Sequence, residues 1–183
     1  MKSPEKGTLL IANPFLKDPN FLRTVVLLCS TDEEGSVGFV LSKKLPLSLH
    51  DIVPEFPDVN IPVFIGGPVQ QDSLYFIHQF PDIIEGGEEV IDGIYWGGNY
   101  ESLKIHLTNQ DLDLEKIKFF AGYSGWSAGQ LDGEMSEDSW ITTTANQLLV
   151  FKSTPDEIWK DALKQIGGPY DQMINYPLDP QLN

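Results

Sequence analysis

The sequence of 183 residues predicts an α+β fold in a single compact domain. Short apolar runs bounded by Gly, Pro, Asn and Asp recur along the chain, and this pattern is typical of strands and turns. Several runs are separated by loops of hairpin length, so they are expected to pair as antiparallel neighbours. Helical patterns are fewer and lie between the strands, without the regular strand–helix alternation that is typical of a parallel sheet.

Apolar runs of strand length recur from residue 8 to residue 151. The expected strands cover residues 8–12, 24–30, 36–41, 63–65, 74–79, 90–96, 116–121, 140–144 and 147–151. The polar loop of residues 31–35 has the length of a hairpin connection, and Ala145-Asn146 is short enough for a tight turn between the last two strands. Both connections indicate antiparallel neighbours.

The clearest helical signal begins at Thr154, where Thr-Pro-Asp-Glu combines a capping box with proline at the first helical position. The apolar residues that follow, including Ile158 and Trp159, fall on one helical face, and Gly167 supplies a stop signal. This helix is therefore expected to cover the sheet. Further helices are expected over residues 47–53, 100–107 and 128–135, the second of them capped by Asn99.

The chain is strongly acidic, with 12 Lys+Arg, 27 Asp+Glu and a formal net charge of −15 at pH 7. Thirteen of the acids but only three lysines lie between Asp82 and Ser139, so this stretch holds most of the net charge. Nucleic acids and anionic membranes are bound through clustered Lys and Arg, so direct contact with either is not expected. The acidic stretch is interpreted either as a solubilising surface or as a docking surface for a basic partner.

Several kinds of chemistry have no support in the sequence. The single cysteine, Cys29, excludes an internal disulfide and is expected to pack as a small hydrophobe. The histidines His50, His78 and His106 lack ligand spacing, so neither a metal nor another cofactor is expected, and His78 is interpreted as an ordinary strand residue. No apolar run is long enough for a membrane span or a signal peptide, so the protein is expected in the cytoplasm.

Arg23 is the only arginine in the sequence and lies five residues after Asp18. A guanidinium is suited to a bidentate carboxylate pair and to holding an anionic ligand. Two interpretations stay open: Arg23 locks its loop through an ion pair, or it binds an anion.

The segment from Gly122 to Leu131 is rich in glycine, serine and aromatic residues. A hydrolase nucleophile elbow would need glycine where Trp126 stands, and this departure weakens Ser124 as a nucleophile. The preceding residues 119–121 are predicted to be a strand that runs into a glycine-lined turn in this segment, followed by a short helix that begins near Ser127. The segment is either a turn that packs Tyr123 and Trp126 on the core or a weak anion site at a helix start.

Glycine turns also follow Ile65 and Trp96. These turns could line one cleft together with the 122–131 segment. In that case backbone N–H groups, aromatic rings and polar side chains would bind a small molecule, and the arginine would bind its negative charge. The residues expected to bind it are Arg23, Gly66, Gly67, Tyr123, Ser124, Trp126 and Gln130. The expectation requires that these residues converge on one concave pocket.

Blocks along nearly the whole chain resemble the AlgH/YqgE-type family of bacterial proteins. They are residues 7–14, 18–28, 38–41, 66–69, 92–98 and 122–131, together with Leu74, His78 and Trp140. The resemblance implies one α+β domain over residues 1–183, built on a twisted, largely antiparallel, partly barrel-like sheet with several packed helices. Some members carry the label of transcriptional regulator.

The resemblance and the missing catalytic motifs lead to the expectation of a non-enzymatic regulator, a monomer or weak oligomer that acts through a protein partner or a small ligand. The alternative is a small-molecule-binding protein or a hydrolase-like enzyme that uses the cleft between the glycine turns. A factor that contacts DNA directly ranks lowest, because no predicted helix carries the basic residues that would contact phosphates.

Overall fold

The computed structural model describes residues 3–177. The strands are β1 (Thr8–Ala12), β2 (Val25–Asp32), β3 (Gly35–Val40), β4 (Lys44–Ser48), β5 (Pro62–Ile65), β6 (Val69–His78), β7 (Glu88–Ile91), β8 (Ile94–Trp96), β9 (Ile117–Ser127) and β10 (Trp140–Thr144). The helices are α1 (Leu49–Ile52), α2 (Tyr100–Asn109), α3 (Gln130–Ser136) and α4 (Ile158–Ile166). Short 3-10 helices cover Leu114–Lys116 and Gly168–Asn175, and Leu148–Lys152 forms a π-helical turn.

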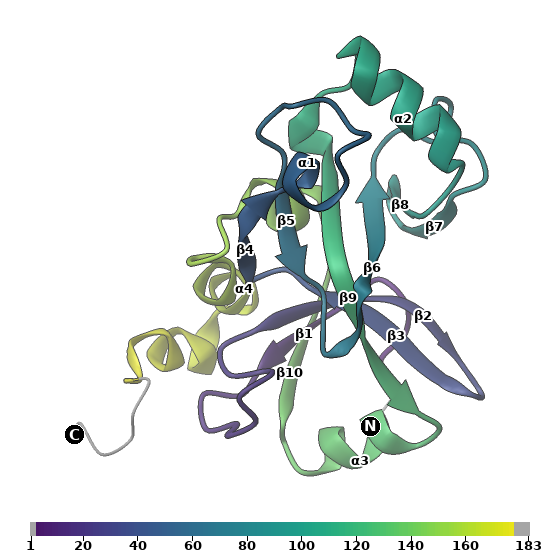
Figure 1. Ribbon diagram of the computed structural model, residues 1–183. Coiled ribbons are helices and arrows are strands. Elements are labelled where there is room, and N and C mark those ends of the chain that lie inside the picture. The colour runs from purple at the N-terminus through teal and green to yellow at the C-terminus, as the bar shows by residue number, and fades with distance from the viewer. Residues whose placement is uncertain (1–2, 178–183) are drawn as a thin grey trace.

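The strands form one curled sheet in the order β10-β1-β2-β3-β9-β6-β8-β7, in which every neighbouring pair is antiparallel. Strand β5 pairs in parallel with the first half of β9 and antiparallel with β4. Strand β9 runs through the centre of the molecule and joins its upper and lower parts (Figure 1). The predicted α+β class, with a largely antiparallel and partly barrel-like sheet, is confirmed.

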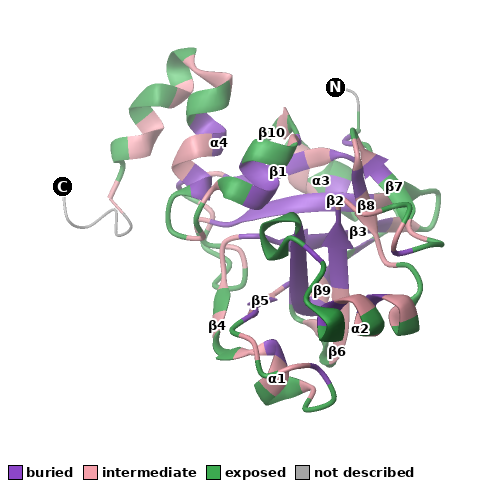
Figure 2. Ribbon diagram, turned by 90° about the horizontal axis from the view of Figure 1, so that it is seen from above, coloured by how far each residue is buried: buried purple, intermediate pink, exposed green. Residues whose placement is uncertain are grey.

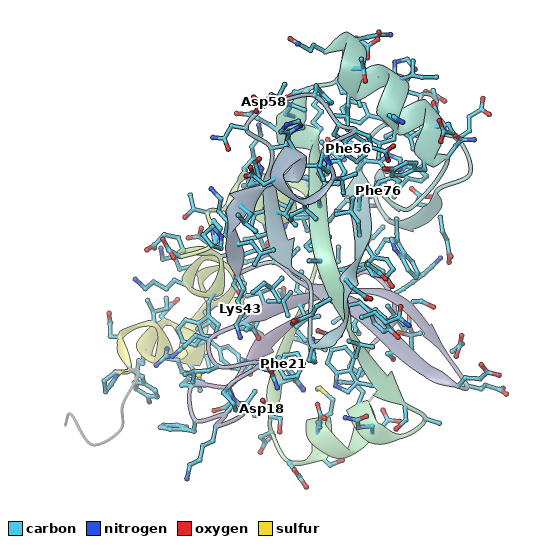
Figure 3. All side chains as sticks on the ribbon, in the orientation of Figure 1. Asp18, Phe21, Lys43, Phe56, Asp58 and Phe76 are labelled. Carbon is cyan, nitrogen blue, oxygen red and sulfur yellow. The ribbon has the colours of Figure 1, made fainter. Side chains whose placement is uncertain are left out.

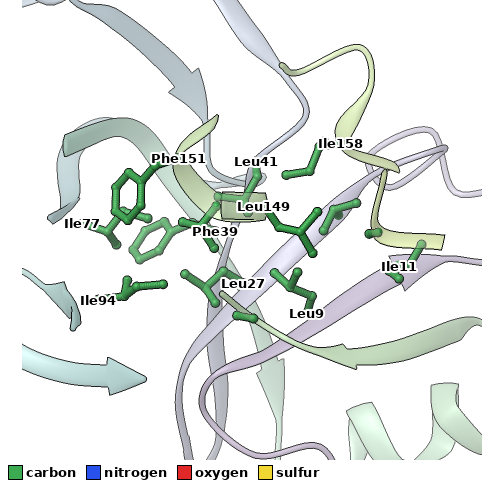
Figure 4. Packing of buried hydrophobic residues seen from close by; sticks show 14 of the residues in the cluster. Leu9, Ile11, Leu27, Phe39, Leu41, Ile77, Ile94, Leu149, Phe151 and Ile158 are labelled. Carbon is green, nitrogen blue, oxygen red and sulfur yellow. The ribbon is translucent and has the colours of Figure 1, made fainter. Parts of the chain in front are cut away.

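Three clusters of buried side chains hold the helices on this sheet. Many residues of the central strands are buried (Figure 2). In the largest cluster, Leu9, Leu27 and Phe39 meet the π-helical turn and α4 (Figure 4). A second cluster lies between α1, α2 and the adjoining ends of β5, β6 and β9, and a third lies under α3. Because Ile158, Trp159, Ala162 and Leu163 are all buried, α4 covers the sheet as expected.

The prediction of a last strand over residues 147–151 is wrong, because the chain forms a π-helical turn over Leu148–Lys152. The Asn146 side chain accepts a hydrogen bond from the Leu149 N–H (2.9 Å), which supports a helical turn where a tight β-turn was expected. A short apolar run fits a buried strand and a buried helical turn equally well, and here Leu149, Val150 and Phe151 are all buried.

Helix starts were predicted with mixed success. The Asn99 cap is confirmed, because its side chain accepts from the Ser102 N–H (2.9 Å). The Thr154 capping box is wrong: α4 begins at Ile158, and in the described part of the chain no side chain caps it. Strand β4 was not predicted, since it contains proline and lies half-exposed at the edge of the sheet.

Within residues 3–177, no helix is both long enough and apolar enough to cross a membrane.

Candidate functional site

The glycines after β5 lie directly against the second half of β9. A Cβ atom added to Gly67 would lie 2.2 Å from the carbonyl carbon and oxygen of Tyr123, and one added to Gly66 would lie 2.3 Å from the Gly122 oxygen. Main chain therefore packs on main chain here, and only glycine fits at either position. We call this region, formed by Gly66, Gly67 and residues 122–124, the glycine crossing.

The carbonyl oxygens of Gly66 and Gly67 both have hydrogen-bond partners. The Gly66 oxygen accepts from the Val40 N–H (2.8 Å) and from the Ser124 hydroxyl (3.0 Å), and the Gly67 oxygen accepts from the Gln71 amide (3.1 Å). Ser124 is fully buried. Its hydroxyl therefore ties β9 to the end of β5, which is a structural task.

Trp126 and Gln130 lie beyond the crossing, at α3. The Trp126 indole donates to one oxygen of Glu134 (2.9 Å), which also accepts from the Trp140 indole (2.8 Å). Gln130 donates to the other oxygen of Glu134 (3.0 Å). Trp126 is only 4% exposed. These hydrogen bonds therefore hold α3 against strands β9 and β10 and leave Trp126 buried.

The expected glycine-lined turn and helix start near Ser127 are wrong. Strand β9 continues to Ser127, and α3 begins three residues later at Gln130. The Gln130 side-chain oxygen accepts from the Ser127 N–H (3.1 Å), so this amide already has an acceptor. The physical reason is that pairing with β3 carries β9 straight through the glycines.

Arg23 lies elsewhere, between the sheet and the C-terminal helices. Its guanidinium carbon is 4.1 Å from the centre of the Trp159 ring, a distance typical of a cation–π contact. The Nη2 group donates to the carbonyl oxygens of Tyr176 (2.7 Å) and Pro177 (2.9 Å).

The ion pair considered between Arg23 and Asp18 is not formed among residues 3–177. Lys43 and Asp18 are both labelled in Figure 3. Burial lowers the pKa of Lys43, and the charge of Asp18 opposes this shift. The Lys43 ammonium donates to the carbonyls of Pro19 (3.1 Å) and Asn20 (2.6 Å), so lysine takes the loop-locking task considered for arginine.

The backbone and stacking partner of Arg23 are both fixed. Arg23 adopts a left-handed conformation with φ of 54°, which is unfavourable for a side chain of this size. The following residue, Thr24, is buried and donates through its hydroxyl to the Phe21 oxygen (2.8 Å). Trp159 donates through its indole to the Ala12 oxygen (2.9 Å), so the ring has a fixed position.

Arg23 and Trp159 line a cavity of about 410 Å³, which we call the Arg23 cavity. Its walls are Leu22, Arg23, Ser42, Pro155, Asp156, Trp159, Lys160, Ile174 and Tyr176. The Arg23 Nε is buried and has no hydrogen-bond partner among the described residues. Burial lowers the pKa of Arg23, yet a guanidinium remains charged at neutral pH. A partly buried cation therefore lines the cavity, and one of its covered donors has no acceptor among residues 3–177.

A second cavity has charged side chains in its walls, but its lysines are paired. This cavity of about 600 Å³ lies between the π-helical turn and α4, and its lysines Lys152 and Lys164 are paired with Glu115 and Asp161. Among residues 3–177, no group of three or more His, Cys, Asp or Glu side chains could hold a metal ion.

His78 lies in β6 as predicted and is fully buried. Its Nδ1 accepts from the Phe80 N–H (3.0 Å), which leaves Nε2 to donate to the Gly97 oxygen (2.9 Å). Burial lowers the pKa of this imidazole, in keeping with a neutral structural role.

The seven predicted binding residues thus lie in three places. Gly66, Gly67, Tyr123 and Ser124 meet at the glycine crossing, Trp126 and Gln130 meet at Glu134, and Arg23 alone lines the Arg23 cavity. Trp159 and Tyr176 were missed as partners of Arg23. The helical spacing of the apolar residues in α4 predicted that Trp159 is buried. No local sequence pattern links Trp159 or Tyr176 to Arg23.

Comparisons with known proteins agree with this architecture. Residues 9–171 match the family model described as AlgH-like. A UPF0301 protein of Chlorobaculum tepidum is 40% identical over 97% of this chain and 95% of its own, and one of Cytophaga hutchinsonii is 40% identical over 97% and 98%. The solution structure of the AlgH protein from Pseudomonas aeruginosa is 28% identical, with a TM-score of 0.75 over 97% of this chain and 98% of its own.

A crystal structure of a Corynebacterium diphtheriae protein, 19% identical, shares the fold with a TM-score of 0.75 over 96% of this chain and 94% of that chain. The family match covers most of the chain, and the relatives align from end to end. The protein therefore belongs to the AlgH-like family, whose curated relatives are named UPF0301 proteins.

Proposed function

We propose that this protein is a non-enzymatic regulator that binds a small anionic ligand in the Arg23 cavity and passes the signal to a protein partner. The observation that carries the proposal is the Arg23 guanidinium, which stacks on Trp159 at 4.1 Å. Arg23 lines a cavity of about 410 Å³, and its buried Nε has no partner in the part of the chain that the structure describes. Small-molecule sites commonly have volumes of about 300–1,000 Å³.

The backbone of Arg23 supports the same proposal. A non-glycine residue at φ of 54° costs roughly 1 kcal/mol or more, and such residues cluster at ligand sites. An asparagine or glycine would adopt this conformation more easily, so a long cationic side chain at this position favours a role that needs the charge.

The wider surface supports a partner other than nucleic acid. The net charge of −15 opposes contact with DNA, RNA and anionic membranes, whereas a protein partner with a basic surface would be attracted. The proposed regulator is a cytoplasmic monomer or weak oligomer, and its regulation of transcription would run through such a partner.

A thermal-shift experiment tests the ligand site. A ligand that binds only the folded state raises the melting temperature by mass action. We expect sodium benzoate, sodium acetate or inorganic phosphate at millimolar concentration to raise the melting temperature of the wild-type protein, and Arg23→Met to abolish the rise.

Lys164→Met is the matched control, because it removes one positive charge from α4 without touching the Arg23 cavity. The control is expected to respond like the wild type. The proposal fails if none of the three anions stabilises the wild type, or if Arg23→Met responds as strongly as the control.

A further inference from the structure

Tyr176 lines the Arg23 cavity, and the carbonyl oxygens of Tyr176 and Pro177 accept hydrogen bonds from the guanidinium. We infer that the Tyr176–Pro177 segment stands in for the carboxylate of an apolar ligand, and that such a ligand displaces it from Arg23. The inference rests on the proposed function and adds to it a ligand class and a competitor built into the chain. We call residues 176–177 the strap.

The hydrogen bonds of Arg23 show what the strap leaves unfilled. Both strap carbonyls accept from Nη2, at 2.7 and 2.9 Å, while the buried Nε has no partner within residues 3–177. Nε and Nη2 lie on the same edge of the planar guanidinium, with their N–H bonds side by side. The strap therefore places two acceptors on one nitrogen of a two-nitrogen edge.

A carboxylate matches that edge better than two peptide carbonyls do. Its two oxygens accept in parallel from two guanidinium nitrogens, and the bonds are strengthened by opposite charge. Exchange of the strap for a carboxylate would give the buried Nε an acceptor and place a negative charge against a partly buried cation.

The remaining walls indicate what the carboxylate is attached to. Trp159, Ile174 and Leu22 line the cavity with apolar surface, and Leu22 is 39% exposed. Lys160 also lines it but is paired with Glu157, and Asp156 adds a negative charge that disfavours multiply charged anions. A monocarboxylate with an aromatic or aliphatic body fits these walls better than phosphate.

The strap is held weakly enough to be displaced. Tyr176 is 38% exposed and Phe15 is 61% exposed, and the centres of their rings lie 5.6 Å apart. The Tyr176 N–H donates to the Met173 oxygen (3.1 Å) at the end of the last 3-10 helix. Segments with few buried contacts open at low cost in free energy.

Benzoate affinity in full-length variants tests the inference. Tyr176→Ser removes the ring contact with Phe15 and frees the strap, so we expect benzoate to bind about five-fold more tightly than it binds the wild type. Leu148→Ser is the matched control: it removes an exposed apolar side chain outside the Arg23 cavity and is expected to bind benzoate as the wild type does. Phe15→Ser removes the same contact from the other side, and is expected to act like Tyr176→Ser.

A second readout follows the strap itself. Benzoate is expected to speed hydrogen exchange at the Tyr176 amide of the wild type, because displacement breaks its bond to Met173. Phosphate is expected to bind at least ten-fold more weakly than benzoate.

Equal benzoate affinity in wild type, Tyr176→Ser and Phe15→Ser would overturn the competitor while leaving the ligand site intact. Weaker binding by Tyr176→Ser would also overturn it, since Tyr176 would then be part of the ligand contact. Failure of benzoate, acetate and phosphate to bind any of these proteins would instead remove the proposed function itself.

Discussion

The glycine crossing and the Arg23 cavity answer opposite physical demands. At the crossing, two main chains approach so closely that added Cβ atoms would lie 2.2–2.3 Å from neighbouring main-chain atoms, and the carbonyls of Gly66 and Gly67 have partners. At the cavity, side chains surround open space, the backbone of Arg23 is in a left-handed conformation, and a buried donor lacks an acceptor.

This difference separates architecture from function. Glycine-rich turns suggest a ligand site because they bring backbone amides to the surface, but the same residues also allow strands to pack without side chains. At the glycine crossing, the hydrogen-bonded carbonyls and the contact of main chain with main chain indicate that the glycines allow close packing. An unsatisfied polar group in a residue that lines a cavity indicates a ligand site, because leaving such a group unpaired does not favour folding.

Gly67→Ala is expected to have the largest effect, since its Cβ would lie 2.2 Å from the carbonyl carbon and oxygen of Tyr123. The substitution should lower the free energy of unfolding by more than about 4 kcal/mol or prevent folding. Chemical denaturation measures this effect. Gly133→Ala is the matched control: the added Cβ meets no described atom within 4 Å, so the change should be neutral or stabilise α3 by up to about 1 kcal/mol. Equal costs would contradict our account of the crossing.

Lys118→Met tests whether a buried cation without an acidic partner marks a site by itself. Lys118 is 8% exposed, its ammonium lies 4.4 Å from the centre of the Phe64 ring, and burial lowers its pKa to about 8. At pH 7 the substitution should stabilise the protein by up to about 3 kcal/mol, since the folded state no longer holds a desolvated charge. Benzoate binding should not change.

The pH dependence of Lys118 has a defined sign. Between pH 8 and 10.5 the unfolded chain still holds the Lys118 proton while the folded chain releases it, so the free energy of unfolding of the wild type should rise with pH there. Lys118→Met should lack this component of the rise. Denaturation curves at pH 7, 8 and 10 measure it, and an identical pH dependence in both proteins would contradict the assignment.

Ser124→Ala should have a smaller effect. It removes one buried hydrogen bond to the Gly66 oxygen, which keeps its bond from the Val40 N–H. The expected loss is about 1–2 kcal/mol in the free energy of unfolding, with unchanged affinity for benzoate. If Ser124→Ala kept full stability but lost benzoate binding, the crossing would be part of a ligand site.

Arg23→Met should change stability least, within about 1 kcal/mol. The lost bonds to the strap and the lost stacking on Trp159 are offset because the folded state no longer desolvates a charge with an unpartnered Nε. The same variant should lose benzoate binding. A large loss of stability would mean that Arg23 holds the C-terminal segment as its main task.

Local patterns predicted much of the fold. Strands Thr8–Ala12 and Trp140–Thr144 have the expected bounds, because apolar runs between turn residues specify them directly. The π-helical turn over Leu148–Lys152 was not predictable in this way, since an apolar run of that length does not distinguish helix from strand.

The site was predictable only in part. Arg23 was a candidate because of its chemistry, but Tyr176, which accepts from it, lies 153 residues away. Stacking on Trp159 depends on how α4 docks against β1, and no pattern near Arg23 encodes that packing. The glycine crossing shows the converse case, in which a strong local signal marks a packing contact.

The four tryptophans allow the most direct test of our central claim, that ligand binding belongs to the Arg23 cavity and not to the glycine crossing or α3. The Trp159 side chain lines the cavity and its indole N–H donates to the Ala12 oxygen, whereas those of Trp126 and Trp140 bind Glu134. In a benzoate titration followed by ¹H–¹⁵N spectra, we predict a saturable shift of the Trp159 indole resonance with little change at Trp126 and Trp140. A saturable shift at Trp126 without one at Trp159 would contradict the claim.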